Sequence, residues 1–381
     1  MNSGTQFARG IRYTVYGIRS FTVVELVIVI ALVAILVAVA TVNILNFRTE
    51  QALKQDAQMV AGALHFAQSK AQLGDGGVDW GIRLSGEANG GYLEIFQGSS
   101  YSTSTVAELK NLSSASKFLN PVAGNIKTIL FTALTGLPST AHTIVLGKDG
   151  SADSVYMVTV SSLGKIEIYK ETGLVGMWEF DEGSGTNAYD ASGNGNTGTL
   201  TNFDFSGSSD WVSLGKSGGA LSFDGSNDYI FIGNPSQYQF IHSSSFTLTA
   251  WIYADSVSSG FKHIAGKSYL DYRFAQNNTA FSFRLDSNNM ILEAPSSIET
   301  GNWVYVAGVY NGDTKKTQIF VDGLESASST NETIDWTTTS NDFQIGNSPG
   351  ESYYFDGYID DVRIYNRALS AEEIKRIYES Y

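Results

Sequence analysis

The chain opens with a long apolar run that contains a single charged residue. Residues 21–45 form this run, Glu25 is the charge, and a leader with Arg9, Arg12 and Arg19 precedes it. As a helix the run would extend about 37 Å, more than the roughly 30 Å of a hydrocarbon core. A carboxylate inside such a run is costly, so we expect Glu25 to have a functional partner. The basic leader predicts a cytoplasmic N-terminus, with everything after the run on the other side.

The helix is predicted to continue beyond the membrane. Apolar residues recur there at alternating spacings of four and three, which is typical of one helical stripe. The glycines of residues 74–77 end the pattern near Leu73. We therefore predict one helix over residues 21–73, with 21–45 transmembrane and 46–73 amphipathic. The stripe consists of Leu53, Ala57, Val60, Leu64, Ala67 and Ala71.

Two β regions are predicted after the helix. Residues 74–172 alternate apolar and polar side chains in short segments, which favours a small antiparallel head. Near Leu174 the composition changes, and Phe246, Leu248 and Ala250 alternate with more polar neighbours, as in a two-sided sandwich. Residues 173–381 are long enough to have their own core, so we expect 174–381 to fold alone.

The start of the apolar run resembles the class III signal of type IV pilins and type II secretion pseudopilins. The order is Arg19-Ser20-Phe21-Thr22-Val23-Val24-Glu25. The resemblance implies that a prepilin peptidase cuts between Ser20 and Phe21, removing leader residues 1–20, and that Phe21 is then methylated. It also implies that Glu25 pairs with the Phe21 amine of a neighbouring subunit. Ser20 departs from the family, which nearly always has Gly there.

The N-terminus allows two other interpretations. The run could be an uncleaved signal anchor, or it could be a secretory signal peptide. A secretory signal needs a shorter apolar core with a small-x-small cleavage site at its far end. This run is longer and continues directly into a helix, so pilin-type processing is favoured.

The C-terminal half resembles laminin-G-like domains of the concanavalin A-like lectin/glucanase superfamily. The resemblance implies a two-sheet jelly roll and covers about residues 174–381. The predicted fold class is therefore α+β: a long pilin helix with a small antiparallel β head, followed by an all-β concanavalin A-like sandwich. The blocks that carry the resemblance are residues 174–185, 190–196, 219–225, 246–252, 302–307, 319–323 and 356–370.

Composition narrows the function classes. A formal net charge of −14 disfavours nucleic-acid binding, because phosphate neutralisation needs a basic surface. The chain has no cysteine, so disulfide and thiolate chemistry are excluded. Its four histidines are scattered without ligand spacing, which disfavours a His-based zinc site.

Catalysis is not predicted. The segment Glu179-Phe180-Asp181-Glu182 is a near miss for the Glu-x-Asp-x-Glu motif of the superfamily's glycan-cleaving enzymes. On a regular strand Glu179 and Asp181 share a face while Glu182 points to the other. A retaining pair needs carboxyl groups about 5 Å apart across one bond, which this spacing does not give. We interpret the segment as a strand end followed by a turn.

One structural Ca²⁺ and one aromatic ligand surface are the remaining candidates. Asp224, Asp228 and Asp360 supply hard oxygen ligands, although such residues are also ordinary turn formers. Aromatic residues in turn-rich stretches could stack on sugar rings or simply pack in the core. These are Tyr269, Tyr272, Trp336, Tyr353 and Tyr354.

The sequence thus favours a minor pilin or pseudopilin that displays a lectin-like domain for adhesion to glycans or surface proteins. The expected partners are other pilin subunits, the prepilin peptidase, the inner membrane and a glycan or protein ligand. The precursor would cross the inner membrane once and then enter a pilus or pseudopilus. The alternative is a structural pseudopilin of a type II secretion or competence system whose C-terminal domain caps the filament or presents cargo.

Overall fold

The computed structural model describes residues 22–381 except 89, 149–154, 206–209, 258–259, 269–270, 286–289, 296–297 and 331–339. The chain forms two compact units, residues 1–50 and 51–381. Helix α1 (Val23–Gln72) begins in the first unit and ends in the second. The predicted long N-terminal helix is therefore confirmed.

The part of α1 in the first unit exposes apolar side chains. Leu26, Val33 and Leu36 leave 53%, 52% and 68% of their surfaces uncovered. Such exposure costs free energy in water and little in hydrocarbon. By length and composition, α1 could cross a membrane.

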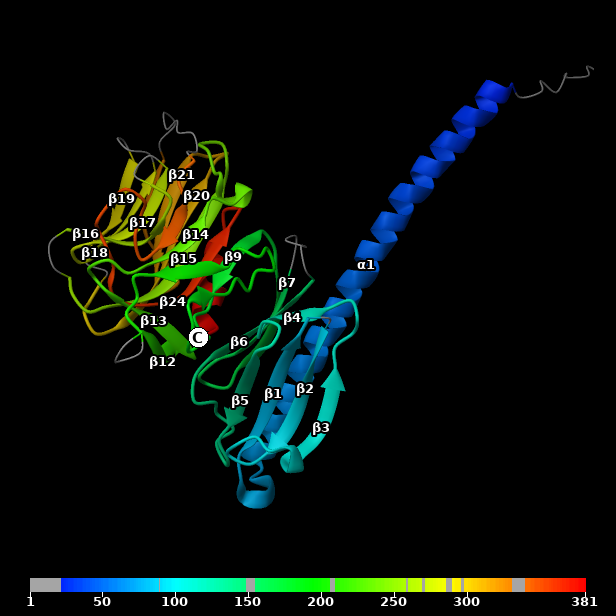
Figure 1. Cartoon of the computed structure of the whole chain (residues 1–381), viewed down its shortest axis with the longest axis horizontal. Helices are drawn as coiled ribbons and strands as arrows, with labels where there is room; N and C mark the ends of the chain where they lie inside the picture. Colours follow the sequence, from blue (N-terminus) through cyan, green and yellow to red (C-terminus); the bar gives the residue numbers. More distant parts are fainter. Residues whose placement is uncertain are drawn as a thin grey trace, which may run out of the picture. The chain divides into compact units, whose positions relative to one another are not determined.

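The second unit begins with the head, in which the rest of α1 packs on antiparallel sheet β3-β2-β1-β5 (Figure 1). The predicted apolar stripe forms this contact: its six residues are at most 4% exposed and share a core cluster with strand residues such as Ile82 and Ile95. A second sheet has the order β4-β6-β7-β8. The strands are β1 (Trp80–Glu87), β2 (Gly90–Gln97), β3 (Val106–Asn111), β4 (Lys117–Asn120), β5 (Ile126–Phe131), β6 (His142–Gly147), β7 (Val155–Val160) and β8 (Ile166–Glu171).

The remainder is a sandwich of two antiparallel sheets around an apolar core. The first, called the β24 sheet, has the order β12-β13-β24-β15-β20-β21-β22, with β9 also paired to β24. Its strands are β9 (Leu174–Trp178), β12 (Trp211–Ser217), β13 (Gly219–Asp224), β15 (Phe246–Ala254), β20 (Trp303–Asn311), β21 (Lys316–Val321), β22 (Leu324–Thr330) and β24 (Asp356–Tyr365). The predicted all-β sandwich is confirmed.

The second sheet, called the β17 sheet, has the order β10-β11-β14-β23-β16-β17-β18-β19. Side chains such as Phe274 and Phe283 point from it into the core, where they meet Phe246 and Leu248 of the other sheet. Its strands are β10 (Asn187–Ala188), β11 (Gly198–Thr201), β14 (Tyr229–Gly233), β16 (Phe261–Gly266), β17 (Tyr272–Asn277), β18 (Ala280–Leu285), β19 (Met290–Ala294) and β23 (Phe343–Ile345).

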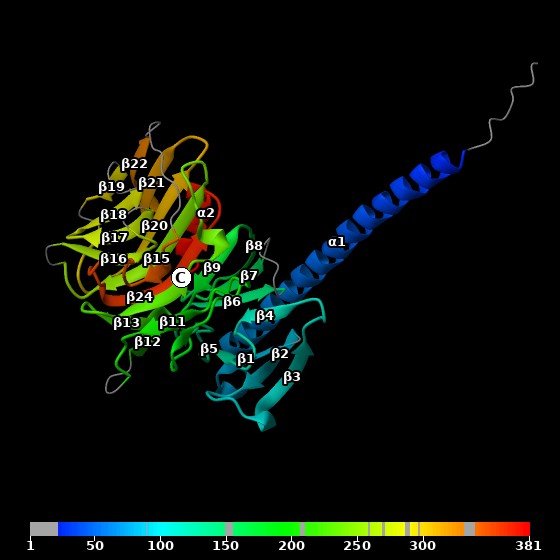
Figure 2. The same ribbon diagram turned by 45° about the horizontal axis from the view of Figure 1, so that its top comes forward.

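The outer face of the β24 sheet is covered as well. Trp251, expected on the more polar side of β15, is 1% exposed and lies 5.6 Å from the Tyr378 ring of helix α2 (Ala371–Glu379). Figure 2 shows α2 beside the sheet. One apolar cluster joins this face and α2 to head residues such as Val145 and Met157. The head and the sandwich therefore share a core, which the sequence did not predict.

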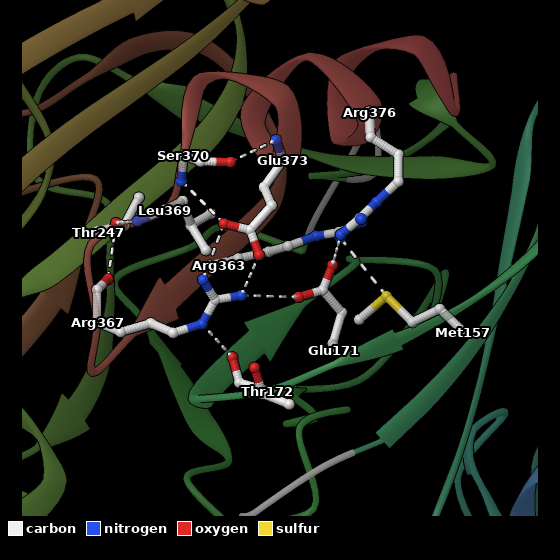
Figure 3. Close-up of polar contacts among 10 residues, drawn as sticks. All are labelled: Met157, Glu171, Thr172, Thr247, Arg363, Arg367, Leu369, Ser370, Glu373 and Arg376. Atoms are coloured by element: carbon white, nitrogen blue, oxygen red, sulfur yellow. Dashed lines mark hydrogen bonds and ion pairs between the residues drawn. The ribbon is translucent and has the colours of Figure 1, made fainter.

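Buried charges reinforce the joint between head and sandwich (Figure 3). Glu171, at the end of β8 and 1% exposed, lies 3.2 Å from Arg376 of α2 and 3.9 Å from Arg367. Arg367 also donates to the Thr172 carbonyl at 2.8 Å. The last head strand is thereby attached to the C-terminal helix.

A fully buried arginine lies deeper in the same joint. Arg363 of β24 is 0% exposed and donates to both oxygens of Asp361, with its Nη2 2.7 Å from Asp361 Oδ2. It also donates to the Tyr381 hydroxyl at 2.6 Å and approaches the Met157 sulfur at 3.6 Å. Both charges are compensated only while the surrounding elements stay assembled.

Candidate functional site

The expected processing site lies at the edge of the described chain. Ser20 and Phe21 are outside the described residues, and α1 begins directly after Thr22. The Glu25 carboxylate accepts from the Thr22 backbone N–H at 2.8 Å, and the Thr22 hydroxyl accepts from the Glu25 N–H at 3.2 Å. This reciprocal pair is a capping box. Glu25 therefore has a local structural role, in addition to the pairing with a neighbouring subunit that the resemblance implies.

The three aspartates predicted to hold Ca²⁺ do not come together. Asp224 lies opposite Asp356 in the β13–β24 register, four positions from Asp360 along β24. The Asp224 carboxylate accepts from Ser226 and Asn227 N–H groups, Asp228 accepts from the Asp224 N–H, and Asp360 accepts from the Ser217 N–H. Among the described residues no group of three or more His, Asp or Glu could hold a metal ion. The predicted three-residue site is therefore wrong, because Asp224 and Asp228 share one turn while Asp360 lies four residues further along β24.

The aromatic residues predicted to bind a ligand differ in how exposed they are. Tyr269 and Trp336 lie outside the described residues. Tyr272 is 0% exposed and its hydroxyl donates to the Tyr238 carbonyl, so it belongs to the core. Tyr354 is half-buried, whereas Tyr353 keeps 44% of its surface exposed. Of the described candidates, Tyr353 is the best placed to touch a ligand.

Polar side chains surround Tyr353 on the outer face of the β17 sheet. Its carbonyl accepts from the His263 N–H at 2.7 Å, and the two rings lie 5.5 Å apart. Glu351 accepts two hydrogen bonds from Arg273, at 2.9 and 3.1 Å. Arg284 lies opposite Arg273 in the strand register and 3.8 Å from the centre of the Phe261 ring. We call these residues the Tyr353 patch: Phe261, His263, Arg273, Arg284, Glu351 and Tyr353.

Burial and the two arginines determine the charge of the Tyr353 patch. Burial, assisted by Arg273 and Arg284, lowers the pKa of His263 to about 3, so this imidazole is neutral at physiological pH. Burial and the neighbouring Arg273 also lower the pKa of Arg284. An exposed aromatic ring beside fixed hydrogen-bond donors can both stack on a ligand ring and orient it. Sequence reasoning found Tyr353 but missed Glu351, two residues away, and the four members that come from strands distant in sequence.

A family model confirms the fold of the C-terminal half. Residues 224–375 match the model described as the concanavalin A-like lectin/glucanases superfamily. These residues form a concanavalin A-like domain. The matched segment contains every member of the Tyr353 patch, so the patch belongs to the lectin-like domain itself.

Solved structures resemble the concanavalin A-like domain at low identity. Domain 4 of AbnA, an extracellular arabinanase from Geobacillus stearothermophilus in complex with arabinotriose, is 20% identical over 54% of this chain and 98% of that one, with a TM-score of 0.42. The binding domain of Paraclostridial Mosquitocidal Protein 1 is 16% identical, over 55% of this chain and 52% of that one, with a TM-score of 0.45.

The botulinum neurotoxin serotype D binding domain is 16% identical, over 54% of this chain and 51% of that one, with a TM-score of 0.41. The present chain thus spans about half the length of the two toxin domains. No curated protein matches the chain.

Residues 179–182, the near miss for the catalytic motif, lie before the matched segment and differ in backbone geometry from the regular strand assumed for them. Strand β9 ends at Trp178, so the expected strand end is confirmed, but Phe180 has a φ of +51°. This turn breaks the alternation assumed for the segment. As a result Glu179, Asp181 and Glu182 all line one cavity instead of facing opposite sides.

Proposed function

We propose that the chain is a minor pilin or pseudopilin that displays its concanavalin A-like domain for adhesion to glycans or surface proteins. One observation carries the proposal: an apolar helix long enough to cross a membrane belongs to the same chain as a lectin-like domain. The segment 19–25 adds the resemblance to a prepilin signal. The helix would pack in the filament, and the domain would meet the ligand.

The Tyr353 patch is the proposed contact with the ligand. Sugar rings present apolar faces that stack on aromatic side chains and hydroxyl groups that need donors and acceptors. Tyr353 offers the ring, while the half-buried Arg284 and Glu351 offer charged hydrogen-bonding groups, and the buried Arg273 holds Glu351 in place. A surface protein could use the same groups through its own polar side chains.

A glycan array tests the adhesive function. We expect residues 51–381, the compact second unit, to bind a defined subset of glycans. Tyr353→Ala should weaken that binding about two- to tenfold, because a stacked aromatic contributes about 0.5–1.5 kcal/mol. Phe205→Ala is the matched control, since Phe205 is also 44% exposed but lies outside the patch. If both variants lose the same amount of glycan affinity, the Tyr353 patch is not the ligand contact. If residues 51–381 bind no glycan on the array, glycans are not the ligand.

Processing and assembly form a second test. In cells with an active prepilin peptidase, mass spectrometry should find a mature N-terminus at Phe21 with a methylated amine. Glu25→Ala should then keep membrane insertion and reduce incorporation into filaments severalfold, because the Phe21 amine of the next subunit loses its partner. An intact Met1 terminus would count against the prepilin interpretation.

The capping box requires its own control in that experiment. Thr22→Ala removes the hydroxyl that caps α1 but keeps the Glu25 carboxylate, at a cost of about 0.5–2 kcal/mol in helix stability. If pairing between subunits matters, Thr22→Ala should assemble nearly normally. If both variants assemble equally poorly, capping explains the role of Glu25 and the pairing hypothesis fails.

A further inference from the structure

A cavity of about 380 Å³ lies away from the Tyr353 patch, where the head meets the sandwich. The loop that follows β9 supplies Glu179, Asp181 and Glu182, and the head supplies Lys127 and His142. Exposed residues at its mouth include Ile126, which is 53% exposed, and Tyr189, which is 38% exposed. The cavity is therefore accessible from the surface.

In one carboxylate that lines the cavity, that of Asp181, both oxygens accept hydrogen bonds from other residues of the protein. Asp181 accepts from Lys127 Nζ at 2.8 Å and from the Gly219 N–H at 2.7 Å. Gly218, with a φ of +75°, is required beside it, because a Cβ there would lie 2.2 Å from Asp181 Oδ1. Lys127 in turn donates to the Thr143 carbonyl at 2.8 Å. Asp181 and Lys127 thus form an ion pair whose charges balance and whose side chains are held in place on one side of the cavity.

The two glutamates are not satisfied in this way. Glu179 is only 8% exposed, and its Oε2 atom is buried without a hydrogen-bond donor among the described residues. Glu182 uses Oε1 to accept from the Tyr189 N–H at 2.6 Å, while its Oε2 is buried without such a donor. A buried carboxylate oxygen with no partner is costly. Both side chains therefore keep an unpaired acceptor oxygen in the wall of the cavity.

The charge around the cavity becomes negative as Glu179 and Glu182 ionise. Burial and the nearby Lys127 lower the pKa of His142 to about 4, so His142 contributes no positive charge at neutral pH. Lys127 is the sole cationic side chain among the described lining residues and is already paired with Asp181. Asp360 is 0% exposed, and its Oδ2 atom accepts a hydrogen bond from the Ser217 N–H. Its Oδ1 atom has no hydrogen-bond donor among the described residues.

We propose that this cavity binds an organic cation through an alkylammonium group that donates to Glu179 and Glu182. An ammonium carries three N–H donors and one positive charge, which matches two acceptors in a negative cavity. The apolar stem of the cation would lie against Ile126 and the Trp211 ring, which also line the cavity. This ligand site is separate from adhesion, so it stands or falls independently of the proposed function.

The same groups argue against other occupants. An anion would meet uncompensated carboxylates. A metal ion needs several converging ligands, and no group of three or more His, Asp or Glu among the described residues could hold one. A neutral polyol could accept or donate hydrogen bonds but would not balance the charge. The ammonium could belong to a free polyamine or to a lysine side chain of another protein.

The pH dependence follows from the two glutamates. Burial raises the pKa of Glu179 to about 8 and that of Glu182 to about 7. Asp181 adds to both shifts and Lys127 opposes both, while Asp361 adds to the shift of Glu179 and Arg363 opposes it. A cation favours the ionised forms, so its binding releases protons and tightens as the pH rises through these values. We expect affinity to increase about tenfold or more between pH 6 and pH 8.

Calorimetric titration of the full chain in non-ionic detergent tests the proposal. The probe is 1,4-diaminobutane, and 1,4-butanediol is the uncharged probe of the same shape. The diamine should bind and the diol should not, with the stated rise between pH 6 and pH 8. An acetylated, amidated Gly-Lys-Gly peptide separates the two sources. Binding of the peptide assigns the site to a protein partner, and its exclusion assigns it to free amines.

Variants complete the design. Glu179→Gln and Glu182→Gln keep the side-chain shape, and each should weaken diamine binding at least tenfold at pH 8 while leaving the melting temperature unchanged or higher. Glu372→Gln, on the exposed face of α2, is the matched control and should bind as the parent does. Equal binding of diol and diamine, binding that is independent of pH, or no binding at millimolar diamine would each overturn the proposal.

Discussion

Replacing Arg363 with alanine is expected to lower the free energy of unfolding of residues 51–381 by about 3–5 kcal/mol. The change leaves Asp361, which is 1% exposed, without the guanidinium that compensates it. Burial raises the pKa of Asp361 and Arg363 opposes this effect, so the variant should hold a protonated Asp361. The loss should therefore be larger at pH 8 than at pH 5. Urea unfolding followed by tryptophan fluorescence measures it.

Two further variants give this prediction its controls. Lys375→Ala removes a charge that is 57% exposed and 3.6 Å from Glu379, so it should change stability by less than about 0.5 kcal/mol. Combining Arg363→Met with Asp361→Leu removes both buried charges and should be less destabilising than Arg363→Ala. If Arg363→Ala costs no more than Lys375→Ala, the buried pair does not stabilise the joint.

Removing the head is expected to destabilise the sandwich strongly. The cluster that joins Trp251 and α2 to Val145 and Met157 would lose its head members in a fragment of residues 174–381. Re-exposing several apolar side chains costs on the order of 5 kcal/mol, at about 1.5–3 kcal/mol for each. Arg367 and Arg376 would also lose the buried Glu171. The fragment should melt well below residues 51–381.

Calorimetry and dye binding distinguish the outcomes. Residues 51–381 should unfold in a single transition and bind little of an apolar-surface dye such as ANS. Residues 174–381 should bind the dye and melt at lower temperature. A fragment of residues 174–381 that melts at the same temperature without dye binding would support the independent folding expected from the sequence. It would also mean that the shared cluster contributes little to stability.

The helix could be predicted from sequence because its signal is local. The spacing of Leu53, Ala57 and Val60 identifies the buried face of α1 without knowledge of its neighbour, and all three are buried. Period two likewise identified Phe246 and Leu248 as core. Each pattern indicates which side chains share a face of a helix or strand. It does not indicate what covers the opposite face, so it could not predict that Trp251 is buried under α2.

The sites were harder to predict because they depend on irregular backbone and on distant partners. Phe180 adopts a φ of +51°, a conformation rare for a residue with a side chain, and it brings Glu182 to the same cavity as Glu179. Tyr272 looked like a ligand-binding aromatic because turn-rich sequence surrounds it, yet it begins a core strand. Composition alone does not separate these cases.

The position of β24 has a consequence for how the chain folds. This strand lies between β13 and β15 and also pairs with β9, although β24 is the last strand in sequence. The β24 sheet therefore cannot close until residues 356–365 have left the ribosome. Because this pairing is non-local, the β24 sheet stays incomplete until almost the whole chain has been made. The proposed display of this domain beyond a membrane would require the chain to cross that membrane unfolded, and such a delay favours that order of events.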